Sequence, residues 1–462
     1  MSFASASGRG VAQSRLPNEM MSAAIDAYVH PYVETNNFSG QLVVMRGGRI
    51  LYERSLGWAD REARIPMTRE TELHIASIST QFTSAAIMRL IDSGALTLDT
   101  RVAAIVPDVR GGDLITIRNL LEQRSGLSDI NSRADYSAVL QAHQTPATLV
   151  GYIARDTLRF APGSMYIHEE HSASNLLALI IEKKSGQSFA RAIERLVFAP
   201  LAMTHSSIDD DAPVRGAEVA LGHDPKGVFE LAATTPIHWS AKSGNASVRS
   251  TAIDQSHWVQ QLFHGHYLQE ATRAAIVDSA SFPFGYGWFR RPNKRFGEFA
   301  YSMSGRSPGF ASYVIHLPRE DLTVVALSNI YSSATADIAL DVAAIALGLP
   351  YAPAVLSRYG FSPDSLKLSG ERFTFPADFY QPNATLAFEM ENGEMYLRWP
   401  SHDRSPVIPI DRDHAIDRAY WEPIEIRRDA VGRATSISYD RFQGTRTDSA
   451  GARAADAAPA PR

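Results

Sequence analysis

The sequence predicts a mixed α/β (α+β) fold, in which a large domain with a central antiparallel sheet and a helical subdomain precedes a small β domain. Strand patterns at residues 41–54 and 300–329 enclose a long helical middle, which favours one sheet built from distant segments. New strand patterns fill residues 360–446. The 462 residues also exceed what one hydrophobic core usually fills, so a second domain is expected.

Composition along the chain predicts four parts. The tail, residues 447–462, is rich in Ala, Pro and Gly and is expected to be disordered, as is a lead over residues 1–18. Between them we predict the large domain over residues 19–350 and the small β domain over residues 360–446.

The large domain is expected to begin with a helix and a hairpin. Apolar residues recur at helical spacing from Pro17 to Val33. Residues 41–45 and 49–54 are β-rich and are joined through Gly47-Gly48. Because both glycines can take positive φ, this pair is typical of a hairpin turn.

A buried helix is predicted over residues 82–91, because its side chains are apolar most of the way round, and Gly94 ends it. Further helical patterns cover residues 115–122, 145–156, 172–184 and 252–264. Residues 311–317 and 322–328 read as strands on either side of a polar turn.

The small β domain shows two strand pairs. Residues 386–390 and 395–399 flank the turn Asn392-Gly393, and residues 420–427 and 434–442 alternate around Val431-Gly432. Trp399, Trp421 and Tyr396 are expected in the core of this domain, with a lid over a neighbouring pocket as the alternative.

Charge and cysteine content exclude several classes of function. Lys plus Arg number 45 and Asp plus Glu 50, and the absence of a basic stripe argues against nucleic acid or anionic membranes as partners. The chain has no cysteine, which excludes disulfides, a thiolate nucleophile and Cys-based zinc sites. The sequence has no run of about 18 apolar residues, so no membrane-spanning helix is predicted. Residues 1–17 lack the apolar region of a signal peptide, so a cytoplasmic protein is expected.

Ser77 stands at the start of the predicted buried helix, within Leu73-His74-Ile75-Ala76-Ser77-Ile78-Ser79-Thr80. Free N–H groups and the helix dipole favour negative charge there, so an alkoxide would form more easily and an oxyanion would find a backbone donor. The plain alternative is that this serine only caps the helix.

Several ordered segments carry a family resemblance: residues 75–83, 94–107, 115–121, 125–127, 162–163, 182–186, 200–204, 250–254 and 305–310. Together they resemble the serine β-lactamase and penicillin-binding-protein-like hydrolases, closest to the class C and esterase branch, across about residues 20–350. The resemblance implies a β-lactamase/transpeptidase-like domain with Ser77 as nucleophile. The small β domain resembles the lipocalin-like module of some members.

The first two catalytic motifs depart from the family. Where members of the family have a lysine one turn after the serine, this chain has Thr80, whose hydroxyl is no base near pH 7. The second motif, Tyr-x-Asn, has no tyrosine. Counting back from Glu182 puts Glu169 at the tyrosine position and His171 at the asparagine position. Counting forward from Pro162 puts His168, in place of Glu169, at the tyrosine position.

The third motif reads Met303-Ser304-Gly305, without the usual lysine or histidine. The resemblance implies an oxyanion hole made by the backbone N–H groups of Ser77 and Arg306. Met303, Ser304, Gly305 and Arg306 are therefore expected to bind substrate, and the Arg306 side chain either pairs with a substrate carboxylate or is simply solvated.

Three functions remain open. The leading hypothesis is acyl transfer or hydrolysis of an ester, amide or thioester through Ser77, with His171 or His168 as a substitute base oriented by Glu169 or Glu170. The second is a repurposed acid–base enzyme, an isomerase, lyase or cyclase, that uses the same His168–His171 cluster. The third is a non-catalytic binding protein. True β-lactamase activity is not expected, because the lysine and tyrosine are missing.

No cofactor or metal is expected. His168 and His171, with His74 as a conceivable third ligand, lack the i, i+4 spacing of the helical zinc motif. The expected partner is a small-molecule substrate, with no nucleic acid and no membrane, and the oligomeric state is left open.

Overall fold

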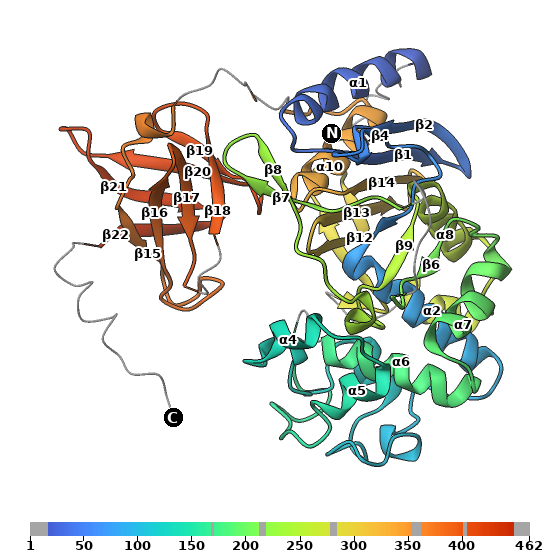
Figure 1. Ribbon diagram of the computed structural model, residues 1–462. Coiled ribbons are helices and arrows are strands. Elements are labelled where there is room, and N and C mark those ends of the chain that lie inside the picture. The colour runs from blue at the N-terminus through green and yellow to red at the C-terminus, as the bar shows by residue number, and fades with distance from the viewer. Residues whose placement is uncertain are drawn as a thin grey trace, which may run out of the picture.

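The computed structural model describes residues 17–167, 171–211, 219–277, 284–352, 356, 362–400 and 404–447. Helices and sheet mix in a large domain, and a closed barrel stands beside it (Figure 1). The mixed fold class predicted from the sequence is confirmed. Most of the predicted lead (1–18) and tail (447–462) lies outside the described residues, and so do His168, Glu169 and Glu170.

A seven-stranded antiparallel sheet forms the centre of the large domain, in the order β10-β11-β12-β13-β14-β1-β2. Its strands are β1 (Gly40–Arg46), β2 (Arg49–Leu56), β10 (Phe284–Gly285), β11 (Trp288–Asn293), β12 (Glu298–Ser307), β13 (Phe310–Leu317) and β14 (Leu322–Ser328). The pairing of Val43 in β1 with Val325 in β14 joins the two distant segments, as predicted. Gly47 and Gly48 both have positive φ in the β1–β2 turn.

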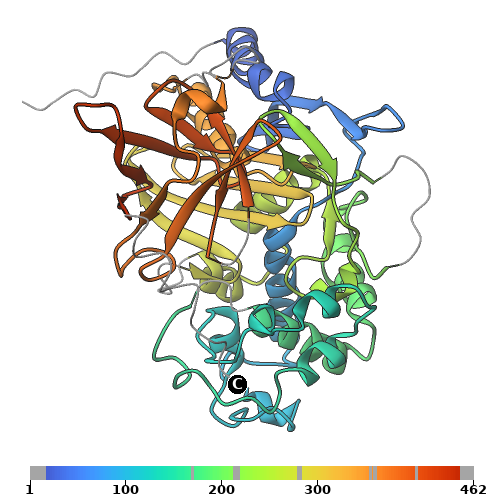
Figure 2. The ribbon, with the colours of Figure 1, turned by 60° about the vertical axis from the view of Figure 1, so that its left-hand side comes forward.

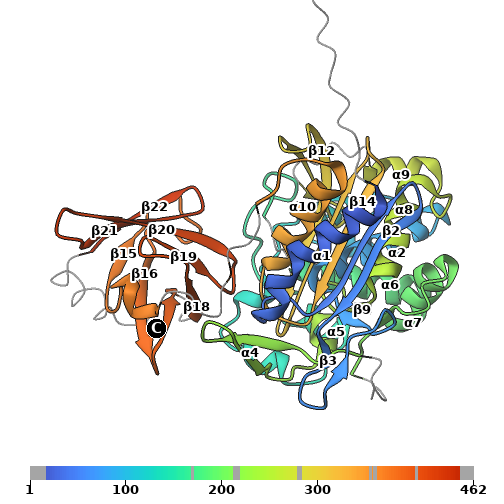
Figure 3. The ribbon, with the colours of Figure 1, turned by 90° about the horizontal axis from the view of Figure 1, so that it is seen from above.

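Helices cover both faces of this sheet. Helices α1 (Asn18–Glu34) and α10 (Ala334–Leu347) lie on one face, and α2 (Ser79–Asp92) and α8 (Ala252–His264) lie on the other (Figure 3). Successive strand residues point to opposite faces, so Val324 of β14 packs toward α1 and α10 while Val325 packs toward α2 and α8. Both faces are thus buried, which explains the nearly continuous apolar run of β14.

Shorter elements form the helical subdomain and its connections. The helices are α3 (Ile117–Leu121), α4 (Tyr136–Leu140), α5 (Pro146–Gly151), α6 (His171–Ser185), α7 (Phe189–Ile193) and α9 (Glu270–Val277). The short strands are β3 (Trp58–Asp60), β4 (Ile65–Pro66), β5 (Leu73–His74), β6 (Ser207–Ile208), β7 (His223–Lys226), β8 (Glu230–Ala233) and β9 (Val248–Ser250). The helix predicted over residues 145–156 ends early, at Gly151, a residue of low helix propensity.

Eight antiparallel strands form the closed barrel: β15 (Arg372–Thr374), β16 (Thr385–Glu391), β17 (Glu394–Arg398), β18 (Arg404–Pro409), β19 (His414–Asp417), β20 (Glu422–Arg428), β21 (Ala434–Tyr439) and β22 (Phe442–Arg446). The strand predicted over residues 434–442 is wrong at its end, because the chain turns at Asp440, which has a positive φ, and Phe442 starts β22. Closure of the sheet leaves no free edge.

Only one of the three aromatic residues expected in the barrel core lies there. Trp399 packs in it, whereas Trp421 packs against Tyr32 of α1 in the core of the large domain, with ring centroids 5.4 Å apart. Tyr396 alternates with the buried Met395 and Leu397 and faces outward. The prediction is wrong for Trp421 and Tyr396, because neither the docking surface nor the barrel's inner face was known from the pattern.

The barrel docks on the large domain beside the β7–β8 hairpin (Figures 1 and 2). Arg418, which is fully buried, donates hydrogen bonds to the carbonyl oxygens of Asn36, Gly227 and Glu230, at 2.7–2.9 Å, and to Oδ1 of Asn37. Glu394 accepts a hydrogen bond from the backbone N–H of Val228. These contacts fix the barrel's position. None of the helices in the described ranges is long and apolar enough to cross a membrane.

Candidate active site

A cavity of about 380 Å³ lies where the sheet, the helical subdomain and the barrel meet. Its lining side chains include Ser77, Asn131, His171, Lys242, Ser304, Arg306, Tyr331 and Tyr420. Ser77, Ser304, Arg306 and His171 had been predicted as site residues, and the structure brings them together. Asn131, Lys242, Tyr331 and Tyr420 were missed, because nothing in their local sequence marks them.

Ser77 lies in a 3₁₀ turn, η1 (Ala76–Ile78), just before α2. The helix proper begins two residues later than the serine, at Ser79. Ala76 has a φ of 50°, a left-handed conformation that is uncommon for a residue other than glycine. The turn is held by Ser312, whose Oγ donates to the carbonyl oxygen of Ile75 at 2.7 Å. Ser77 is therefore presented on a constrained turn in an otherwise buried segment.

Gly305 of β12 lies directly against this turn. A Cβ atom at Gly305 would stand 2.5 Å from the carbonyl oxygen of Ile75 and 2.9 Å from the backbone nitrogen of Ser77. Such distances do not occur between real Cβ atoms and backbone, so only glycine allows the strand to approach the serine this closely. The β11–β12 pairing reaches only to Ser302, and β12 continues past it along the cavity.

Side chains on β12 alternate between the core and the cavity. Met303 is buried and packs with Ile75 and Ile78, whereas Ser304 and Arg306 line the cavity. Met303 was expected to bind substrate, but the structure places it in the core because it shares the face of Gly305.

Thr80 occupies the position of the family's lysine and faces the backbone. Its Oγ1 donates a hydrogen bond to the carbonyl oxygen of Ser77 at 2.8 Å, and its side chain is buried. This i to i−3 bond is a common use of a threonine in the first turn of a helix. Thr80 therefore supports the turn and takes no part in the cavity lining described above.

His171, the first residue of α6, is oriented by two side chains of the preceding subdomain loop. Its Nδ1 lies 3.2 Å from Oδ1 of Asp129, and its Nε2 lies 3.3 Å from Nδ2 of Asn131. Hydrogen bonding to the carboxylate assigns the proton to Nδ1 and leaves a lone pair on Nε2. His171 and Asp129 are each about one-sixth exposed, so the pair is only partly screened by water. Sequence reasoning missed Asp129, although it follows the matched Ser125-Gly126-Leu127 segment.

Lys242 is a second basic group in the cavity. It ends the 3₁₀ turn η6 (Trp239–Lys242), is largely buried, and donates from Nζ to the hydroxyl of Tyr136 at 2.8 Å. Burial, together with the nearby Asp129 charge, raises the pKa of Tyr136, so its hydroxyl stays protonated near neutral pH.

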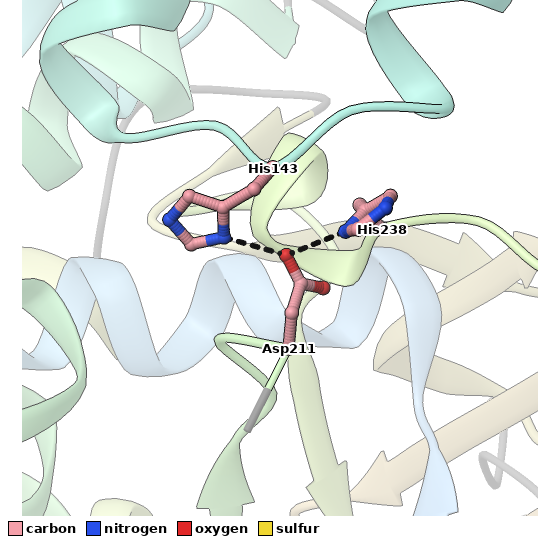
Figure 4. A group of neighbouring side chains, drawn as sticks. All are labelled: His143, Asp211 and His238. Carbon is pink, nitrogen blue, oxygen red and sulfur yellow. Dashed lines mark hydrogen bonds and ion pairs between the residues drawn. The ribbon is translucent and has the colours of Figure 1, made fainter. Parts of the chain in front are cut away.

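A carboxylate outside the cavity holds the start of η6. Oδ2 of Asp211 lies 2.9 Å from Nδ1 of His143 and 3.1 Å from Nδ1 of His238 (Figure 4). The Asp211 carboxylate also accepts hydrogen bonds from both the backbone N–H and the hydroxyl of Ser240. Asp211 thereby ties the turn that carries Lys242 to the α4–α5 loop.

The Arg306 guanidinium forms one wall of the cavity. Its Cζ lies 4.1 Å from the ring centroid of Tyr331 and 4.3 Å from that of Tyr420, which comes from the barrel. Nε and Nη2 of Arg306 are buried and have no hydrogen-bond partner among the residues that the structure describes. The two rings hold the guanidinium in place at the cavity wall.

His74 has a different role from that of a third metal ligand beside His171. Its ring stacks on Trp239 at 3.5 Å, and its Nε2 lies 3.3 Å from Oδ2 of Asp209. Burial, with a smaller contribution from Arg249, lowers the pKa of His74. The residue thus packs beneath η6.

The family model described as Beta-lactamase matches residues 25–348, well over half of the chain. The chain belongs to the β-lactamase family. A D-aminopeptidase of Brucella ovis is 27% identical over 337 residues, 72% of this chain and 64% of that protein, so the match spans under two thirds of that relative. A penicillin-binding protein of Bacillus subtilis is 26% identical over 64% of this chain and 69% of its own length.

Among solved structures, the octameric penicillin-binding protein homologue from Pyrococcus abyssi aligns with a TM-score of 0.62 and 21% identity, over 93% of this chain and all of that one. The part of this chain that the alignment leaves out is smaller than the barrel, so the alignment includes residues of the barrel. At this identity the likeness shows a shared fold alone.

Proposed function

We propose that this protein is a serine hydrolase or acyltransferase in which Ser77 is acylated and His171, oriented by Asp129, is the base. The observation that carries the proposal is geometric: Ser77 and His171 line one cavity, and Asp129 hydrogen-bonds the ring nitrogen that faces away from Asn131. A serine, a histidine and a carboxylate in these roles reproduce the logic of a catalytic triad on different residues. Glu169 and Glu170, expected to orient the base, lie outside the described residues.

The proposed reaction begins when Nε2 of His171 takes the proton of Ser77 as Oγ bonds to the substrate carbonyl carbon. Nδ2 of Asn131 lies 3.3 Å from this nitrogen. Because this hydrogen bond is long, the serine hydroxyl can replace it. His171 then returns the proton to the leaving alcohol, thiol or amine. In the second half, His171 deprotonates water or another acceptor, which attacks the acyl carbon. The bond between this carbon and Oγ then breaks, and His171 returns the proton to Oγ of Ser77. The Asp129 carboxylate stabilises the imidazolium.

The backbone N–H groups of Ser77 and Arg306 are the proposed oxyanion donors. The close approach at Gly305 supports this, because it holds β12 against the serine turn. Backbone donors persist although the side chains of all three motifs differ from the family's.

Gly305→Ala is expected to slow reaction at Ser77 by about 100-fold or more, because the new Cβ would push β12 from η1 and separate the two donors. The rate of covalent labelling by a fluorophosphonate measures this. Gly151→Ala is the matched control, since a Cβ there meets nothing within 4 Å, and it should label at the wild-type rate. A folded Gly305→Ala protein that labels normally would remove the oxyanion assignment.

Arg306 supports a substrate with a carboxylate near the scissile bond. The Arg306 side chain lines the cavity, and a guanidinium can form the paired hydrogen bonds that a carboxylate accepts. The D-aminopeptidase among the relatives suggests short peptides with a free carboxylate as the first substrates to test.

The experiment is labelling of the full-length protein with a fluorophosphonate and with an activated ester, followed by intact mass and peptide mapping. A single adduct on Ser77 is the expected result. A folded protein with no adduct would contradict the proposal and favour the repurposed acid–base enzyme.

His171→Gln is expected to lower the labelling rate by about 100-fold or more, because the glutamine amide cannot accept the proton. Asp129→Asn should lower it in the same direction by favouring the wrong tautomer. Lys242→Met tests the competing base in the same cavity and is expected to cost less. If Lys242→Met abolishes labelling while His171→Gln labels normally, the base is the lysine and the assignment of His171 is wrong.

A further inference from the structure

A second polar cluster lies at the other end of the sheet from the cavity. It consists of His264, the last residue of α8, His316 on β13 and Asp321 in the β13–β14 turn. Each residue offers one ligand atom, and the three atoms all lie within 4.8 Å of one another. Three segments far apart in the chain thus aim metal-binding atoms at one point.

Two atoms of this cluster lack hydrogen bonds. Among the residues that the structure describes, Nε2 of His316 and Oδ1 of Asp321 are both buried without a hydrogen-bond partner. Oδ1 of Asp321 is 2.9 Å from Nε2 of His264, but the direction is not that of a hydrogen bond. Buried polar atoms are almost always satisfied, so these two atoms are suited to bind a ligand.

The surroundings of His316 are those of a metal-ligating histidine. Its side chain is fully buried, and its Nδ1 lies 3.0 Å from Oγ1 of Thr323, its direct cross-strand neighbour. A proton on Nδ1 donated to Thr323 leaves the lone pair on Nε2 and fixes the ring.

We propose that His264, His316 and Asp321 bind one divalent late transition-metal ion, with Zn²⁺ as the first candidate. Two imidazoles and one carboxylate are ligands that Zn²⁺ prefers, whereas Ca²⁺ and Mg²⁺ select oxygen sets. In a tetrahedral site with bonds of about 2 Å, ligand atoms stand roughly 3.3 Å apart, which the cluster can reach. The side chains of His264 and Asp321 are 42% and 31% exposed, which leaves room for water as a fourth ligand.

The ion would join the end of α8 to the β13–β14 turn. The same turn already receives a hydrogen bond from Gly47, whose N–H donates to the carbonyl oxygen of Asp321. The site is therefore structural, and it stabilises the face of the sheet that supports α2 and the serine turn.

The cluster of His143, Asp211 and His238 (Figure 4) provides an internal comparison. There the carboxylate of Asp211 is fully occupied by hydrogen bonds from both histidines and from Ser240. Both imidazoles are also about half exposed. Protein donors explain that arrangement without an ion, so it serves as the control.

The test uses tag-free full-length protein, stripped with a chelator and titrated with Zn²⁺ or Co²⁺. Calorimetry should give one ion per chain, Co²⁺ should produce a visible absorption band, and Tm should rise with metal concentration. His264→Gln and Asp321→Asn change partly exposed side chains and should weaken metal binding at least about tenfold. His143→Gln/His238→Gln should bind as the wild type does.

A second pair of variants tests the orientation of His316 without removing a ligand. Thr323→Val should weaken metal binding about 10–100-fold, and Thr323→Ser, which keeps the hydroxyl, should restore it. A wild-type chain that binds no ion, or binding that is lost in His143→Gln/His238→Gln and kept in His264→Gln, would overturn the proposal. The cluster would then be a histidine–carboxylate ion pair beside a buried neutral ring.

Discussion

Ser77→Ala is expected to abolish the covalent adduct and to lower turnover by about a thousandfold or more, because it removes the only atom that the proposed mechanism acylates. The backbone N–H of residue 77 remains, and so does Gly305 against it, so the variant should still bind substrate. Intact mass after fluorophosphonate treatment measures the first effect, and hydrolysis of the activated ester measures the second.

Ser93→Ala provides the control for this variant. Ser93 follows α2 and donates its hydroxyl to the carbonyl oxygen of Leu90, away from the cavity. It should label as the wild type does. An adduct that persists in Ser77→Ala, on whichever residue it maps to, would contradict Ser77 as the nucleophile.

Arg418→Met is expected to destabilise the protein by about 3 kcal/mol or more, since hydrogen bonds to a charged donor contribute about 1.5–3 kcal/mol each and several buried acceptors would lose theirs. The acceptors include the carbonyl oxygens of Asn36, Gly227 and Glu230. Chemical denaturation measures the loss. Because Tyr420 lies two residues further on and contacts Arg306, the variant should also raise KM.

Arg404→Met is the matched control on the same barrel. Arg404 is one-third exposed and pairs with Glu391 on the surface, a type of ion pair worth about 1 kcal/mol or less. Equal destabilisation by the two variants would show that Arg418 does not anchor the barrel.

Local patterns in the sequence predicted the secondary elements and the position of the serine. The helix over residues 252–264 has the predicted bounds, and Gly47-Gly48 forms the predicted turn, because each depends on the side-chain period or backbone freedom of one short segment. Ser77, Ser304 and Arg306 were found through ordered motifs, which survive as sequence even where the catalytic side chains have changed.

The partners of those residues were decided by the tertiary structure. Asp129 reaches His171 from a loop, Lys242 comes from a turn beyond α7, and Tyr420 comes from another domain. None of these polar residues carries a periodic signal, since periodicity reports which face of an element is buried and not which side chain stands opposite.

The sequence by itself thus determined the large domain's architecture, the exclusion of cysteine chemistry, and a serine before a buried helix without its lysine. Only the tertiary structure decided that a histidine held by an aspartate shares the serine's cavity and that a barrel arginine docks the second domain. The tertiary structure also decided that the ligand atoms of His264, His316 and Asp321 lie close together. The physical reason is that these arrangements depend on how the sheet, the helices and the barrel pack. Packing brings together residues that are far apart along the chain, and no local sequence pattern marks such pairs.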